Sequence, residues 1–185
     1  MDTLLSVAIG IGLSAACGFR IFMPPLFMSL ATLYGHLPLS PDFQWIGSEH
    51  ALVAFFAATC VEIAAYYIPV IDNLLDTVAT PTAIGVGTLL TAALIPDTDP
   101  LLQWTLAVVA GGGSAGIIQS LTGMLRFSST ALTLGLGNAV ISTIEAASSV
   151  VLSVLAIFAP ILAVGLVVGG VILLLSKRLR KQQSI

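Results

Sequence analysis

A long apolar run, from Thr3 to Tyr34, contains a single charged residue, Arg20. A second run, from Leu101 to Leu136, also contains one charged residue, Arg126. As one helix the first run would measure about 50 Å, which exceeds the ~30 Å hydrocarbon core of a bilayer but is short for two full crossings and a turn. Inside a membrane, a block of this length has to tilt, break or fold back.

The overall composition also places the chain in a membrane. Hydrophobic residues make up 57% of it and charged residues only 8%, whereas about a quarter of the residues in a soluble globular protein are charged. The 185 residues suffice for roughly six to eight membrane segments of about 20 residues each. We therefore predict an all-α, polytopic helical membrane protein whose main partner is the lipid bilayer, and no soluble enzyme domain.

Each long block contains residues that interrupt a helix. The stretch from Gly18 to Pro25 combines a glycine, Arg20 and two prolines, and the second block contains the glycine-rich stretch from Gly111 to Gly116. Proline removes a helical hydrogen bond and favours a break. The glycines could bring the backbone close to a ligand, or they could let helices pack closely, and both interpretations stay open.

The chain also aligns weakly with itself. An offset of 100 positions places Ser14-Ala15 on Ser114-Ala115, and later an offset of 83 places Glu62 on Glu145. This pattern predicts two related halves, each beginning with a broken or re-entrant helix block. The halves are inverted if each crosses the membrane an odd number of times, as in many transporters, and parallel otherwise.

The predicted boundaries follow from these blocks. The first half, residues 1–96, has a broken block (3–35), a Pro-rich loop (36–50), a span (51–68), a surface helix (70–80) and a span (82–95). The second half, residues 97–185, has a broken block (101–136), spans (138–158 and 161–175) and a basic tail (176–185).

Two glutamates lie within predicted spans and are the central candidates for function. A charge at bilayer depth is costly unless it is paired or lines a wet cavity. Tyr66 lies one helical turn after Glu62, while Asn138 and Ser142 share a helix face with Glu145. The glutamates either hold helices together or line a polar pathway as carboxylates that handle protons or cations, and we favour the pathway.

Four further charged residues complete the candidate site. Arg20 and Arg126 are the natural counter-charges, because the other four basic residues crowd into Lys177–Lys181. Arg126 could pair with Glu145, and Arg20 with Glu62, or the arginines could bind an anion. Asp72 and Asp76, one turn apart on the predicted surface helix, are either solvated acids or a cation site at the mouth of the pathway.

Other classes of site find no support in the sequence. The chain lacks Ser-His-Asp, Cys-His and paired metal-ligand spacings, so we expect no enzyme activity, no metal and no cofactor. It also lacks the mixed basic and aromatic surface of a nucleic-acid-binding protein. The basic cluster after the last apolar run predicts a cytoplasmic C-terminus.

Three stretches resemble a bacterial family of small, multi-span membrane proteins known only as a domain of unknown function. They are Gly18–Leu26 with the small residues leading to Gly35; Glu62 with Ile68-Pro69, Asp72 and Asp76; and Arg126–Ala131 with Gly135–Ser142 and Glu145. The resemblance covers nearly the whole chain and implies a multi-pass protein of the bacterial inner or plasma membrane. It implies no activity.

Taken together, these features predict a small transporter or channel for an ion or small polar solute. Its site would lie between the halves, with Glu62 and Glu145 facing one another near the midplane of the bilayer. Two alternatives remain, a membrane scaffold or accessory subunit that transports nothing and a protein that handles lipid. Small-residue faces also favour association into homo-oligomers.

Overall fold

The structure is a computed structural model that describes residues 3–95, 98–133 and 136–182. Parts of the predicted segments lie outside these residues: positions 1–2 and 96 of the first half, position 97 at the start of the second half, positions 134–135 of the second block, and positions 183–185 of the basic tail. The helices are α1 (Thr3–Cys17), α2 (Met23–Leu33), α3 (Glu49–Ala65), α4 (Pro69–Leu94), α5 (Pro100–Leu106), α6 (Gly113–Thr133), α7 (Asn138–Phe158) and α8 (Pro160–Gln182). A 3-10 helix, η1 (Pro41–Gly47), precedes α3, and a π-helical segment, η2 (Ala107–Gly112), joins α5 to α6. The described residues are all-helical, without a strand, as predicted.

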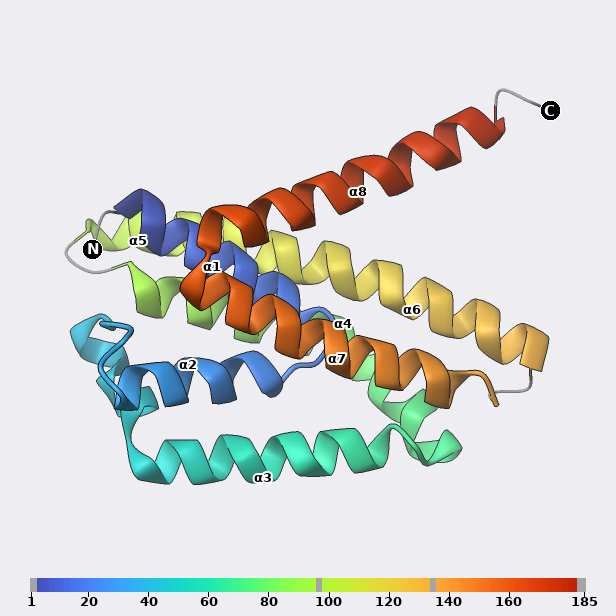
Figure 1. The fold of residues 1–185 in the computed structure, drawn as a ribbon, viewed down its shortest axis with the longest axis horizontal. Coiled ribbons are helices and arrows are strands. Elements are labelled where there is room, and N and C mark those ends of the chain that lie inside the picture. Colours follow the sequence, from blue (N-terminus) through green and yellow to red (C-terminus); the bar gives the residue numbers. More distant parts are fainter. Residues whose placement is uncertain (1–2, 96–97, 134–135, 183–185) are drawn as a thin grey trace.

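Helix α1 is the centre of the bundle. It packs against α4, α6, α7 and α8, while α2 and α3 form a layer on one side (Figure 1). Because α1 has neighbours on several sides, its small polar residues bond to other helices: the Ser14 hydroxyl donates to the Gly87 carbonyl at 2.6 Å and lies 2.9 Å from Thr91 Oγ1. Small residues let these backbones approach closely, as is usual between membrane helices.

The first apolar block folds back on itself. Helix α1 ends at Cys17, the chain turns through Gly18–Phe22, and α2 begins at Met23 with prolines in its first turn, where no intrahelical N–H bond is lost. The two helices have 15 and 11 residues, or about 22 and 16 Å, so neither reaches across a ~30 Å core. The start of α1 and the end of α2 point toward the same end of the molecule (Figure 1), and the block is a hairpin.

The second apolar block does not fold back, and the break predicted there is absent. Helix runs from Pro100 to Thr133 as one candidate membrane span of 34 residues. The glycine-rich stretch is absorbed by the π-helical segment η2, because a helix can take up an extra residue as a wide turn without ending. The two blocks therefore differ in shape, despite their alignment in sequence.

The glycines in this stretch allow close packing against α4. A Cβ atom on Gly111 would lie 2.7 Å from the Gly87 carbonyl oxygen, and one on Gly112 would lie 2.6 Å from Thr88 Oγ1. Gly113 has no such neighbour within 4 Å. Of the two interpretations of the glycine-rich stretch, the contacts of Gly111 and Gly112 fit helix packing.

The predicted boundary between a surface helix and a span is wrong, because α4 is continuous across it. The surface helix over 70–80 and the span over 82–95 are one helix of 26 residues with Pro81 inside it. Ala79 and Ala83, on either side of this proline, are buried in the core, so packing compensates for the hydrogen bond that proline removes. As a result, the first turns of α4 join the bundle, and Asp72 is only 2% exposed.

The long helices are those of a multi-pass membrane protein. Three have the length and apolar character to cross a bilayer: Leu74–Leu94, Pro100–Thr133 and Asn138–Phe158. A fourth span is added if η1 and α3, which are bent by 64°, cross together. Helices α1, α2 and the apolar part of α8 are shorter, so the described residues provide three or four full spans and not the six to eight segments estimated from length.

Candidate functional site

A cluster of charged and polar side chains lies where the tip of the α1–α2 hairpin meets four other helices. All nine candidate residues from the sequence are close to this junction and are linked by contacts. They are Arg20 from the hairpin tip, Glu62 and Tyr66 from the end of α3, Asp72 and Asp76 from the start of α4, Arg126 from α6, and Asn138, Ser142 and Glu145 from α7. We call these nine residues the charged cluster.

Arg126 makes the largest number of contacts in the charged cluster. Its Nε donates to Glu145 Oε1 at 3.0 Å and its Nη2 to Glu145 Oε2. Its Nη1 donates to Asp72 Oδ1 and lies 3.6 Å from Asp76 Oδ1. With its side chain only 2% exposed, this guanidinium binds α6 to α4 and α7, using the fork geometry that lysine lacks.

Arg20 joins the hairpin tip to α7. Its Nη2 donates to the carbonyl oxygen of Ser142 at 2.8 Å and to the Ser142 hydroxyl, and it lies 3.6 Å from Glu145 Oε2. Its Nε and Nη1 are buried without a hydrogen-bond partner. Glu145 is thus shared between the two arginines, and part of the Arg20 guanidinium has donors that are not used.

The ring of Tyr66 contacts both arginines. The guanidinium carbon of Arg20 lies 4.0 Å from the ring centroid, and that of Arg126 lies 4.2 Å from it. An aromatic face attracts a cation, and the attraction strengthens when water is excluded. Tyr66, itself 6% exposed, therefore helps to hold two positive charges close together.

The Glu62 carboxylate accepts hydrogen bonds from backbone amides and not from an arginine. Its Oε1 accepts the N–H of Ile21 at 2.7 Å and its Oε2 accepts that of Phe22 at 3.0 Å. These amides immediately precede α2, where N–H groups lack helical partners and the helix dipole favours a negative charge. A carboxylate from α3 thereby fixes the hairpin tip.

Asp72 and Asn138 close the network at the start of α4 and α7. The Asn138 side-chain amide donates to Asp72 Oδ2 at 2.9 Å and to Thr130 Oγ1 at 3.0 Å. Asn138 Oδ1 and Asp76 Oδ1 are buried atoms without a hydrogen-bond partner. The Asp76 side chain is 25% exposed, compared with 2% for Asp72, so the cluster reaches the outside at Asp76.

These contacts settle which of the pairs suggested by the sequence are present. The Arg126–Glu145 pair is present, but Arg20 pairs with Glu145 and not with Glu62. The two glutamates do not face one another in a shared contact, since Glu62 bonds backbone amides and Glu145 bonds arginines. The amides of Ile21 and Phe22 and the hydroxyl of Thr130 were missed in the sequence, although the prolines that follow Met23 do mark a helix start.

The cluster lies toward one end of the bundle. Asp72 is the fourth residue of α4 and Asn138 is the first of α7, whereas Arg126 precedes the end of α6 by seven residues, or about 10 Å. Figure 1 shows this end to the right, where α3 and α6 finish and where α8 is also directed. The cluster thus lies nearer to one end of α4, α6 and α7 than to the other.

The charges of the cluster do not balance. Glu62, Asp72, Asp76 and Glu145 provide four carboxylates against two guanidinium groups, so the fully ionised cluster has two excess negative charges. Among the described residues no group of three or more His, Cys, Asp or Glu side chains could hold a metal ion.

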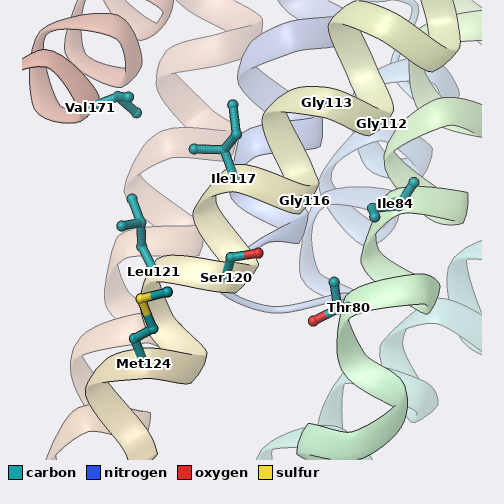
Figure 2. A pocket seen from close by; sticks show the side chains of 10 residues that line it. All are labelled: Thr80, Ile84, Gly112, Gly113, Gly116, Ile117, Ser120, Leu121, Met124 and Val171. Atoms are coloured by element: carbon teal, nitrogen blue, oxygen red, sulfur yellow. The ribbon is translucent and has the colours of Figure 1, made fainter. Parts of the chain in front are cut away.

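Two cavities between the helices are lined by residues outside the charged cluster. One, of about 580 Å³, opens between α4, α6 and α8 and is lined by apolar side chains such as Ile84, Ile117 and Leu121 (Figure 2). Another, of about 310 Å³, lies between α6, α7 and α8 and is lined by Leu152 and Leu166, among others. Both are lined mainly by apolar side chains.

Comparison with known proteins identifies a family and no activity. Residues 7–181 match the family described as a domain of unknown function (DUF4126), and because the match covers most of the chain, the protein belongs to that family. No curated protein and no solved structure matches the chain.

Proposed function

We propose that this family member is a small membrane transporter or channel for an ion or small polar solute, and that the charged cluster is its site. The observation that carries the proposal is the burial of two arginines and their carboxylate partners around the tip of a hairpin that does not cross the bilayer. Such residues define the pathway in many membrane transport proteins.

Energy is the first support for this proposal. Taking a charge out of water costs several kcal/mol, and a buried ion pair recovers this only with very good geometry. Apolar residues of similar volume are often as stable as such a pair, or more so. A cluster that retains six charged groups, with two more carboxylates than guanidinium groups, is therefore better explained by a role in function than by stability alone.

The hairpin is the second support. Non-helical backbone at membrane depth is tolerated where it is buried in protein or lines a water-filled cavity. Here Gly18–Phe22 is held by two sets of polar contacts, Glu62 to the tip amides and Arg20 to Ser142 and Glu145. Breaking either set frees the tip from α3 or α7, so the cluster can couple solute binding to movement of the hairpin.

The orientation follows from the basic residues after Ser176. Lys and Arg next to a membrane segment remain in the cytoplasm, so we place the C-terminus there, in a bacterial inner or plasma membrane. Because α8 is directed toward the end that contains the cluster (Figure 1), the cluster lies near the cytoplasmic face. In this arrangement the start of α1 and the end of α2 lie toward the opposite, non-cytoplasmic face. A solute would pass along the hairpin tip.

The test is flux through proteoliposomes that contain the purified protein. Swelling in urea or glycerol reports small polar solutes, and ion-sensitive dyes report protons, sodium and potassium. Wild-type protein should conduct one of these probes, and Glu62→Gln and Glu145→Gln should reduce that flux. Glu49→Gln, a change at an exposed acid on α3, is the matched control and should leave it unchanged. If the wild type conducts none of the probes, or if both cluster variants conduct normally, the proposal is wrong.

A membrane scaffold is the second candidate, and one observation favours it. Most of the charged groups form ion pairs with one another, and the two cavities that border α8 are apolar. A scaffold requires Glu62→Gln and Glu145→Gln to lower the unfolding temperature in detergent while no flux is seen in any form of the protein. Measuring both quantities on the same preparations separates the two functions.

A further inference from the structure

Three of the four carboxylates in the charged cluster are well compensated. Glu62 accepts two backbone N–H bonds, and Glu145 accepts two bonds from Arg126. Asp72 accepts one bond from Arg126 and one from Asn138. Each of these three carboxylates therefore accepts a hydrogen bond at both of its oxygens.

Asp76 differs from these three carboxylates in its hydrogen bonds and in its exposure. Its Oδ1 is buried without a hydrogen bond, and it lies 3.6 Å from Arg126 Nη1, an atom that already donates to Asp72. The Asp76 side chain is 25% exposed, whereas those of Asp72 and Glu145 are 2% and 4% exposed. Asp76 is thus the most exposed of the four carboxylates in the cluster.

Asn138, which bonds Asp72 in the same cluster, provides an independent observation. Asn138 is 5% exposed, its amide nitrogen is occupied by Asp72 and Thr130, and its Oδ1 is buried without a donor. An unpaired buried acceptor costs free energy. The network therefore contains two acceptors without a hydrogen-bond donor, Asp76 Oδ1 and Asn138 Oδ1.

The surrounding charges select the kind of ion. Asp76 faces Asp72 on its own helix, Arg126 on α6 and Glu145 on α7, with Arg20 at the hairpin tip and Tyr66 at the end of α3. Because carboxylates exceed guanidinium groups by two, the cluster favours a cation over an anion, even though Arg20 has unused donors. Within the described residues no group of three or more His, Cys, Asp or Glu side chains could hold a metal ion, and a proton is a cation that a single carboxylate can bind by itself.

We infer that Asp76 is the residue through which the proposed transporter binds and releases a proton at the cytoplasmic end of its site. This rests on the proposed function, since it assigns the coupling ion of the same cluster. The carboxylate accepts a proton from hydronium and releases water. The excess negative charge then falls from two to one, Arg126 keeps Asp72 and Glu145, and protonated Asp76 becomes a donor in a network with an unpaired acceptor.

Infrared difference spectra of the purified protein in detergent, between acidic and alkaline buffers, test the binding step. The expected result is a protonated-carboxyl band that Asp76→Asn lacks and that Asn138→Ala shifts. Glu49→Gln should remove a different band, from a carboxyl group in water. Asp76→Asn spectra identical to those of the wild type, or an Asp76 band that Asn138→Ala leaves in place, would overturn the inference.

Flux measurements test the coupling step separately. With a pH-sensitive dye inside proteoliposomes, an imposed membrane potential should drive protons through the wild type, and Asp76→Asn should reduce this flux at least tenfold while Asp76→Glu retains most of it. Conduction of other probes without protons, or equal proton flux in Asp76→Asn, refutes the role of Asp76 and leaves the proposed function standing. Absence of flux for every probe refutes the proposed function itself. Unfolding temperatures of the Asp76 variants show whether each is folded.

Discussion

Arg126→Met removes the guanidinium that joins three helices in the charged cluster. Without it, Glu145 keeps only the 3.6 Å contact with Arg20, and Asp72 keeps only the amide of Asn138. Both carboxylates remain buried. Removing one partner of a buried ion pair typically costs about 3–5 kcal/mol, because the other charge is left uncompensated, and here two charges are left.

We therefore expect Arg126→Met to lower the free energy of unfolding by at least about 3 kcal/mol. Equilibrium unfolding in mixed detergent micelles, followed by circular dichroism, measures this quantity. Arg126→Lys should fall between the wild type and Arg126→Met, since an ammonium group keeps the charge but cannot make the same forked bonds to Glu145.

The double variant Arg126→Met with Glu145→Met is the control for this reasoning. It removes both members of the pair, so its loss of stability should be smaller than the sum of the two single losses by about 0.5–3 kcal/mol. If Arg126→Met lies within about 0.5 kcal/mol of the wild type, as surface substitutions do, the contacts of Arg126 do not contribute as argued. Additive losses in the double variant would also refute a direct coupling between Arg126 and Glu145.

Two further pairs of variants test the packing and the aromatic contact, and unfolding temperature in detergent is the measurement for both. Gly111→Ala should destabilise by about 1–3 kcal/mol, because its Cβ would lie 2.7 Å from the Gly87 carbonyl oxygen. Gly113→Ala, which meets no atom within 4 Å, should be neutral or stabilise by up to about 1 kcal/mol; equal effects would contradict the close packing of α4 on η2. Tyr66→Leu should cost about 2 kcal/mol more than Tyr66→Phe, because only Phe keeps an aromatic face for the two guanidinium groups. Equal stability of these two variants would show that the cation–π contacts are not significant.

Much of the candidate site could be predicted from the sequence because the chain is surrounded by lipid and not by water. In an apolar chain each retained charge stands out, and bilayer physics requires it to find a partner. For this reason the nine residues that the sequence singled out, including Arg20 and Asp76, which are 56 positions apart, lie in one network of contacts in the structure, whereas Thr130 and the amides of Ile21 and Phe22 were missed. The same physics identified an all-helical fold and the bounds of α7, since backbone groups in lipid must bond within their own segment.

The partners within the site were decided only by the tertiary structure. Sequence could not show that Glu62 bonds the amides of Ile21 and Phe22, because backbone donors leave no trace in residue type until a helix start is placed against α3. Nor could it show that Arg20 and Glu145 meet across 125 positions.

The shapes of the two long apolar blocks were likewise decided by packing. Both contain one charge and helix-breaking residues, yet the first folds back at Gly18–Phe22 while the second continues as helix from Pro100 to Thr133. Glycine permits either a break or a close contact, and at Gly111 the neighbouring α4 provides the contact. The sequence by itself determined that a few polar residues must meet inside a membrane bundle, and the tertiary structure decided where they meet and with whom. The physical reason is that burial of charge is a local requirement, whereas partner choice depends on which backbones can approach each other.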